Sequence, residues 1–196
     1  MREKASARIL ESALRVFARK GNGATVSDIA EEAGVSQGLA YRYFASKDAM
    51  FHALLRQMLQ SGEAEEFYRE EGKTPRERLE RFITDTMRLR RERPELYRLL
   101  FQALWEERLP KDIRQRLASR GREVRRVIRE LIMEGQAIGE VSKGEPDQLV
   151  DVILACLEGL SMRMAYSEPG ASVSLPDPEV VLRLLGPARS EGGGAA

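Results

Sequence analysis

The stretch that most constrains the fold runs from Thr25 to Lys47, TVSDIAEEAGVSQGLAYRYFASK, and places two short helical segments around one glycine. Thr25 followed three residues later by Asp28 is the pattern of a capping box, which predicts the start of a helix. Gly34 can end that helix, because glycine adopts the left-handed backbone conformation without a steric penalty. The stretch therefore predicts a helix, a tight turn and a second helix.

The second helix has an outer surface that is unusual for a helix facing solvent. Ser36 is its predicted cap and Phe44 its predicted end, and a further serine, Ser46, caps the helix that follows. At a period of 3.6 residues, Ala40 and Phe44 face inward. The side chains that remain outside come from Gln37, Gly38, Tyr41 and Arg42.

That outer surface suits the major groove of DNA. Gln37 and Arg42 can hydrogen-bond base edges, and Gly38 lets the backbone approach a phosphate closely. Phosphate contacts that fix the register are expected from Tyr41, Tyr43 and Lys47. The spacing predicts a helix-turn-helix whose second helix is the recognition helix, with a solvated surface helix as the alternative interpretation.

The residues of this stretch and of the helix before it resemble, in the same order, the DNA-binding segment of the TetR family of bacterial transcriptional regulators. The matching positions are residues 17–21, Thr25, 28–30, 33–36, Gly38, Tyr41, 43–44 and 46–47. The resemblance implies DNA contacts from Thr25, Ser36, Gln37, Gly38, Leu39, Tyr41, Arg42, Tyr43 and Lys47. The pair Leu39-Ala40 departs from the small polar and large apolar pair that is usual in the family, which leaves the base contacts of Leu39 open.

The resemblance also implies an architecture. We expect an all-α fold of about nine helices, with a three-helix DNA-binding domain over residues 1–50, a ligand-binding and dimerisation domain over 51–187, and a disordered tail over 188–196. Apolar periodicity and caps predict further helices that begin at Thr74, Pro94 and Pro146, with a long helix over 111–138 and a last one over 177–185. The helix from Pro94 is apolar most of the way round, so we expect it to be buried. In the family, the last two helices pair with their copies in a homodimer.

Composition and motif content limit the kinds of protein that this chain can be. The net charge is only +1, although residues 1–60 hold nine Lys and Arg against six Asp and Glu, and residues 61–196 hold 23 against 25. Without a long apolar stretch or a leader pattern, we expect a cytoplasmic protein with no membrane span. The single cysteine, Cys156, excludes an internal disulfide, and His52 has no partner at metal-ligand spacing. We find no nucleophile with its base and no phosphate-binding loop, so we expect no enzyme activity, no metal and no cofactor.

A set of methionine, aromatic and aliphatic residues in the second half of the chain has two interpretations. One is ordinary core; the other, which the resemblance favours, is a pocket for a small-molecule effector, where methionines suit a flexible apolar ligand. The set comprises Phe82, Met87, Phe101, Leu104, Trp105, Ile128, Met133, Met162 and Tyr166. The arginine-rich face of the long helix is either solvated surface or a basic mouth for a ligand with phosphates, such as an acyl-CoA.

Taken together, the sequence favours a homodimeric repressor that occupies a palindromic operator. A small apolar or amphipathic effector would release it, with a fatty acyl thioester as the first hypothesis and a hydrophobic drug as the second. Two other interpretations stay open: an activator or effector-independent DNA-binding protein, and a helical enzyme or scaffold that has kept the motif.

Overall fold

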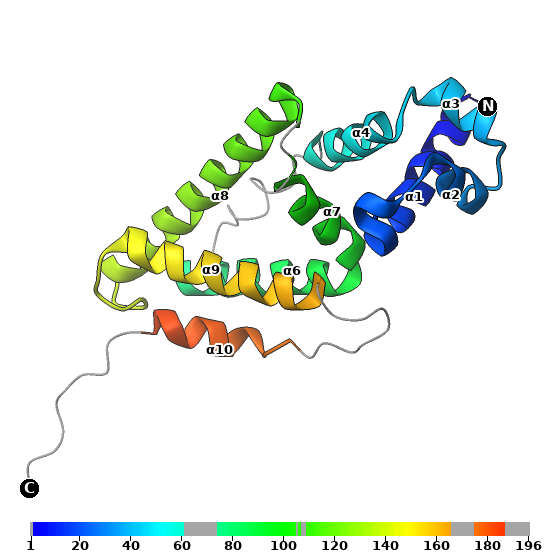
Figure 1. The fold of residues 1–196 in the computed structure, drawn as a ribbon. Coiled ribbons are helices and arrows are strands. Elements are labelled where there is room, and N and C mark those ends of the chain that lie inside the picture. The colour runs from blue at the N-terminus through cyan, green and yellow to red at the C-terminus, as the bar shows by residue number, and fades with distance from the viewer. Residues whose placement is uncertain (1, 61–73, 105, 107–108, 166–174, 187–196) are drawn as a thin grey trace, which may run out of the picture. The chain divides into compact units, whose positions relative to one another are not determined.

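A computed structural model describes residues 2–60, 74–104, 106, 109–165 and 175–186. Over these residues the fold is all-α, with nine α-helices and two short 3-10 helices, which confirms the predicted fold class and helix number (Figure 1). Trp105, Tyr166 and the predicted tail over 188–196 lie outside the described residues. The contacts divide the chain into two compact units, each with its own apolar cluster.

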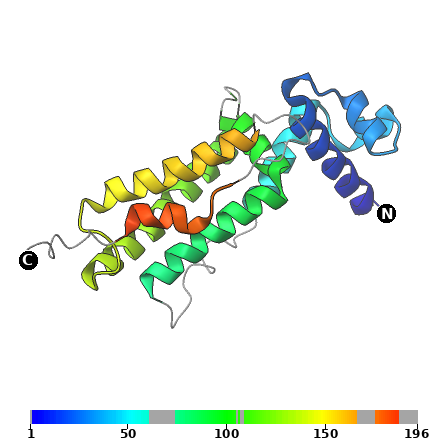
Figure 2. The same ribbon diagram turned by 90° about the horizontal axis from the view of Figure 1, so that it is seen from below.

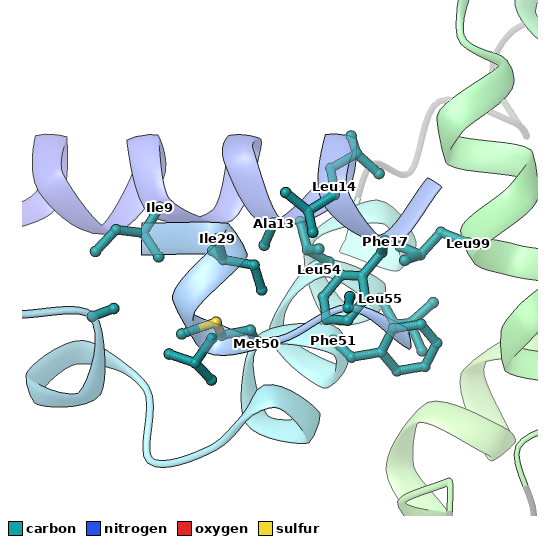
Figure 3. Close-up of a cluster of buried hydrophobic side chains, with 14 of the residues drawn as sticks. Ile9, Ala13, Leu14, Phe17, Ile29, Met50, Phe51, Leu54, Leu55 and Leu99 are labelled. Carbon is teal, nitrogen blue, oxygen red and sulfur yellow. The ribbon is translucent and has the colours of Figure 1, made fainter. Parts of the chain in front are cut away.

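The first unit contains the predicted helix-turn-helix. It is built from α1 (Arg2–Lys20), η1 (Gly21–Gly23), α2 (Val26–Glu32), α3 (Gln37–Tyr43), α4 (Lys47–Gln60), α7 (Pro94–Leu104) and the first turns of α8 (Lys111–Ala137). Figure 3 shows side chains from α1, α2, α4 and α7 converging on one buried cluster. Phe17 and Phe51 meet there edge to face, with ring centroids 5.4 Å apart, an arrangement worth about 0.5–1.5 kcal/mol beyond area burial.

The helix from Pro94 is less buried than its apolar composition predicts. α7 packs against α1 through one side, where Leu99 and Ala103 are almost fully buried. Leu104 follows directly after Ala103 and points away from that contact, so 66% of its surface is exposed. The expectation that this helix is buried is therefore wrong, because composition does not show how many sides of a helix contact other elements.

The second unit is a bundle of α6 (Pro75–Glu92), the remainder of α8, α9 (Pro146–Ala165), α10 (Pro178–Leu182) and η2 (Arg183–Leu185). Figure 2 shows α10 lying along α6 and α9. The predicted cap of α6 is confirmed, because Thr74 Oγ1 accepts from Glu77 N at 3.3 Å and Glu77 Oε2 accepts from Thr74 N at 3.0 Å. The predicted starts of α7 and α9 are confirmed as well.

Arginines on the second part of α8 have acidic partners. Arg126 pairs with Glu123 and Glu130, while Arg125 pairs with Asp151 on α9. Arg129 reaches Asp147, at the start of α9, with its Nε 3.3 Å from a carboxylate oxygen. This part of the arginine-rich face is therefore a surface of paired charges.

Both α9 and α10 keep apolar side chains on the outside. α9 buries Val150, Ile153 and Leu157 in the cluster, whereas Val152 is 47% exposed. Val180 on α10 is 50% exposed. Met162 and Leu184 are exposed as well. Within the described part of the chain, α9 therefore has one apolar side in the cluster and further apolar side chains exposed on the outside.

Two glycines of α8 give opposite stability predictions. A Cβ on Gly135 would lie 2.5 Å from Cγ2 of the buried Val141, whose β-branched side chain cannot easily rotate away, whereas a Cβ on Gly121 meets nothing within 4 Å. We expect Gly135→Ala to lower the free energy of unfolding by about 1–3 kcal/mol. Gly121→Ala should raise it by about 0.5–1 kcal/mol. Urea unfolding followed by circular dichroism measures both, and equal effects of the two substitutions would contradict this packing.

Candidate nucleic-acid interface

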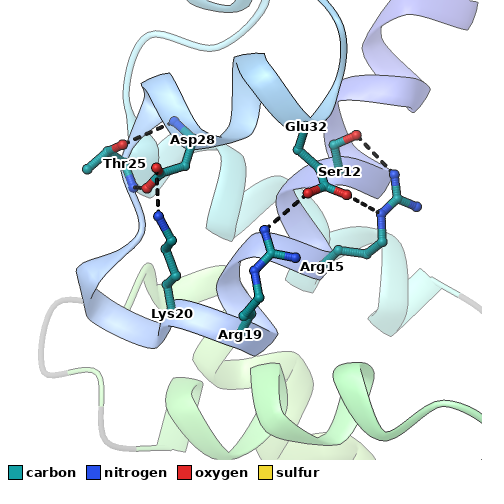
Figure 4. A network of polar contacts seen from close by, with 7 residues as sticks. All are labelled: Ser12, Arg15, Arg19, Lys20, Thr25, Asp28 and Glu32. Carbon is teal, nitrogen blue, oxygen red and sulfur yellow. Dashed lines mark hydrogen bonds and ion pairs between the residues drawn. The ribbon is translucent and has the colours of Figure 1, made fainter. Parts of the chain in front are cut away.

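The start of α2 is fixed by the predicted capping box. Thr25 Oγ1 accepts from Asp28 N at 3.1 Å, and Asp28 Oδ2 accepts from Thr25 N at 3.0 Å. Lys20, at the end of α1, donates from Nζ to Asp28 Oδ1 at 2.7 Å (Figure 4). The Lys20 ammonium, and then hydrogen bonds from Thr25, lower the pKa of Asp28 to about 2. The cap thus also ties α2 to the end of α1.

A second clamp holds the other end of α2. Glu32 accepts from Arg15 Nε and from Arg19 Nη2, both at 3.1 Å, so two arginines of α1 share one carboxylate of α2 (Figure 4). Arg19 first, and then Arg15, hold the pKa of Glu32 below its usual value. Arg15 also donates to the hydroxyl of the buried Ser12 at 3.2 Å. The sequence analysis did not predict Glu32 as the partner of Arg15 and Arg19.

The turn after α2 follows the sequence prediction. Gly34 has a φ of +62°, a left-handed conformation that favours glycine. Its N–H donates to the Glu31 carbonyl, and the Val35 N–H donates to the Ala30 carbonyl, both at 3.0 Å, which satisfies the end of the helix. Ser36 then caps α3, since its Oγ accepts from Leu39 N at 3.2 Å.

α3 is held by few buried atoms and exposes most of its surface. Ala40 is fully buried, and Tyr43 and Phe44 pack against the cluster while staying partly exposed. Tyr41 is 48% exposed. The side chains of Gln37 and Arg42 and the backbone of Gly38 are exposed too. The predicted division of this helix into an inner and an outer side is confirmed, and the individual DNA contacts stay a prediction.

Neither packing nor backbone conformation explains a glycine at position 38 over the described residues. A Cβ at this position would meet nothing within 4 Å, and its φ is not positive. A glycine in a helix costs about 0.5–1 kcal/mol relative to alanine. The missing side chain therefore leaves free space on the outer surface of α3, next to Gln37, where another molecule could approach closely.

Lys47, at the start of α4, has a partner that the sequence did not predict. Its Nζ donates to the backbone carbonyl of Asn22 at 2.8 Å, and Asn22 Oδ1 accepts from Gln102 Nε2 on α7 at 2.7 Å. The Ser46 cap of α4 is confirmed, with its Oγ accepting from Ala49 N at 3.0 Å. The only sequence signal for Asn22 is that it is the one asparagine of the chain and lies three residues before Thr25.

The proposed effector residues are spread over the structure. Phe82, Met87 and Ile128 lie buried in the cluster of the second unit, where Met133 and Met162 are exposed. Phe101 and Leu104 belong to the first unit, on the partly exposed α7. With Trp105 and Tyr166 outside the described residues, a pocket lined by the whole set stays a prediction.

Other site chemistry is sparse. Over the described residues, no three His, Cys, Asp or Glu side chains gather to hold a metal ion. None of the helices there is long and apolar enough to cross a membrane. Burial lowers the pKa of His52. Cys156 is half-buried and packs against the second cluster. A polar surface hollow is lined by Arg19, Lys20, Asp28, Glu31 and Glu32, mostly the clamp residues themselves.

Comparisons with known proteins match both parts of the chain. A family model described as bacterial regulatory proteins, tetR family, matches residues 9–54. A second, described as BetI-type transcriptional repressor, C-terminal, matches residues 75–175, just over half of the chain.

Three individual proteins illustrate the similarity. The uncharacterized HTH-type transcriptional regulator YfiR of Bacillus subtilis is 42% identical over 62 residues, 31% of this chain and 30% of that protein. The HTH-type transcriptional regulator BetI of Brucella anthropi is 36% identical over 77 residues, 38% of this chain and 40% of that protein. These matches span less than half the length of the curated relatives. The crystal structure of the MbdR regulator from Azoarcus sp. CIB is 25% identical and covers 92% of this chain and 97% of its own, with a TM-score of 0.73.

The clamp at the start of α2 predicts a dependence of stability on pH. Because the folded pKa of Asp28, about 2, lies below its ordinary value of 3.8, its contribution is present above about pH 4 and is lost as the pH falls towards 2. We expect Asp28→Asn to lower the thermal midpoint at pH 7, and the difference from wild type to shrink between pH 4 and pH 2. Glu31→Gln, which removes a carboxylate of the same helix, is the control. A deficit of Asp28→Asn that persists unchanged at pH 2 would show that charge is not the cause.

Proposed function

This chain belongs to the TetR family of bacterial transcriptional regulators, and we propose that it is a cytoplasmic repressor that binds a palindromic operator as a homodimer and leaves it when a small molecule binds. Family membership makes it a DNA-binding regulator. The direction of regulation, the operator and the effector are our proposal. The observation that carries the proposal is the outer surface of α3, which is polar and exposed and is fixed by the Ser36 cap at its start and by the buried Ala40.

The residues around α3 divide into two roles in this proposal. Gln37 and Arg42 contact base edges, where a good bidentate pair discriminates by about 1–3 kcal/mol. The remaining contacts are with the backbone of the duplex and set the register without reading sequence. They come from Thr25, Ser36, Gly38, Tyr41, Tyr43 and Lys47, and the base contacts of Leu39 stay open.

We propose that the two copies of the homodimer contact each other through the exposed apolar side chains of α9 and α10. Exposed apolar side chains on two neighbouring helices mark a surface that a partner would cover. A second copy is the partner that the family resemblance implies. Two recognition helices about 34–36 Å apart would then enter successive major grooves of a palindrome.

The effector is proposed to be a small apolar or amphipathic molecule bound in the C-terminal region. The buried lining candidates are Phe82, Met87 and Ile128, which offer a phenyl ring, a thioether and an aliphatic group but no charge. A fatty acyl thioester such as an acyl-CoA is our first candidate and a hydrophobic drug our second. To release DNA almost completely, the effector must favour the released state by about 5 kcal/mol.

Substitution of Gly38 separates folding from DNA binding. We expect Gly38→Ala to raise the free energy of unfolding by about 0.5–1 kcal/mol, since a Cβ meets nothing within 4 Å among the described residues, and to weaken duplex binding by about tenfold or more. The control is Gly121→Ala on α8, where a Cβ also meets nothing within 4 Å among the described residues. It should stabilise the fold by a similar amount and leave DNA affinity unchanged. Denaturant unfolding and fluorescence anisotropy with labelled duplexes measure the two effects. Unchanged DNA affinity of Gly38→Ala would contradict close approach of DNA at this position.

Negative charge introduced by substitution on the exposed apolar side of α9 and α10 tests the proposed dimer interface. The double substitution Val152→Glu and Val180→Glu places two carboxylates on the proposed interface, and we expect it to give monomers in light scattering and at least about a tenfold loss of duplex affinity. Leu89→Glu on α6 is the matched control, because Leu89 is also 47% exposed. A double variant that stays dimeric would place the interface elsewhere.

Native mass spectrometry of the purified protein tests the effector. We expect a bound compound of low polarity, and addition of that compound should lower the affinity for a duplex selected from random sequences. Treatment with hydroxylamine distinguishes the two candidates, since it cleaves a thioester and leaves a drug intact. If no extracted compound changes DNA affinity, the effector-independent alternative replaces this part of the proposal.

A further inference from the structure

Asn22 joins two elements through two different groups. Its backbone carbonyl accepts from Lys47 Nζ at 2.8 Å, and its side-chain Oδ1 accepts from Gln102 Nε2 at 2.7 Å. Asn22 lies in η1, between the end of α1 and Thr25, the N-cap of α2. One residue therefore lies between α7 and the first residue of α4, all within the first compact unit.

The Asn22 carbonyl fixes the Lys47 ammonium without using up its capacity to bind. An ammonium has three N–H donors, and the bond to the carbonyl occupies one of them. Two donors remain for phosphate oxygens. A lysine held in this way also loses less side-chain freedom when DNA arrives than a freely rotating one, which favours binding.

The Gln102 side of this connection comes from another part of the chain. Gln102 and Arg98 are one helical turn apart on α7, and Arg98 Nη1 donates to the Ala18 carbonyl in the last turn of α1 at 3.3 Å. Between them, Leu99 is buried against the cluster. Asn22 falls in the region matched by the tetR-family model, whereas Gln102 falls in the region matched by the BetI-type C-terminal model.

We propose that Asn22 is a positioning residue. Through it, α7 controls the orientation of the Lys47 ammonium and so the affinity of Lys47 for the DNA backbone. When Gln102 holds the Asn22 side chain, η1 is fixed and its carbonyl orients Lys47 towards phosphate. When α7 shifts along α1, the bond from Gln102 breaks, η1 loosens and the Lys47 ammonium is no longer oriented. The inference rests on the proposed DNA-binding function and adds a route to it that does not pass along α4.

The test compares variants in their binding to a random-sequence duplex of about 30 base pairs over a range of NaCl concentrations. Lys47→Ala should weaken binding and lower the salt slope by about 0.9 for each phosphate that the lysine neutralises in the wild type. Asn22→Ala and Gln102→Ala, which keep Lys47 itself, should each weaken binding by about threefold to tenfold. Gln115→Ala, an exposed glutamine on α8, is the matched control and should bind as wild type does.

The decisive variant combines Gln102→Ala with Lys47→Ala. Once Lys47 is absent there is nothing left to position, so the double variant should bind no more weakly than Lys47→Ala alone. A general loosening of the fold would instead multiply the two effects. Thermal unfolding of each variant shows whether the fold is intact.

The outcomes separate the inference from the function on which it rests. If wild type binds the duplex but Gln102→Ala binds equally well, or if the two effects multiply in the double variant, the inference is wrong and the proposed function stands. If Lys47→Ala or Gln115→Ala contradicts its expected behaviour, the inference is wrong as well. If wild type binds no duplex at low salt, the proposed function fails and the inference with it.

Discussion

The first unit depends on small buried side chains where α2 and α3 meet the rest of the cluster. Ala30, Ala33 and Ala40 are almost fully buried there, and α3 has no other fully buried residue. A helix that is anchored through one fully buried methyl group, the partly buried Tyr43 and its capped start can turn most of its remaining surface outward. Larger residues at these positions would push α3 away from the cluster, and the polar outer surface would lose its fixed direction.

The ion pairs around α2 distinguish the cations that position this helix from the exposed arginine of α3. Arg15, Arg19 and Lys20 of α1 are paired with Glu32 and Asp28 of α2, so their charges position a helix. Each exposed pair contributes little alone, but together they hold both ends of α2 against α1. Figure 4 shows this network. The arginine of α3, Arg42, is exposed and is not one of its members. Counting charges over residues 1–60 misses this distinction, because it adds paired and available cations together.

Local features of this fold could be predicted from the sequence, and contacts between distant segments could not. The Thr25 and Thr74 caps and the left-handed Gly34 are set by residues within three or four positions, so spacing alone indicates them. The inner and outer sides of α3 follow from helical periodicity. The bond from Gln102 to Asn22 joins residues 80 positions apart, and no local pattern reports it. For the same reason the predicted effector set, chosen by residue type, falls partly in a buried cluster and partly on exposed surface, and the predicted division at residue 50 stays a functional hypothesis.

Hydrogen–deuterium exchange with and without a fragmented genomic duplex at low salt tests most directly whether the outer surface of α3 lies against DNA. We expect slower exchange in peptides that span residues 25–47, with unchanged exchange in α6. Protection confined to the arginine-rich part of α8, or no change with any duplex, would contradict a DNA-facing α3.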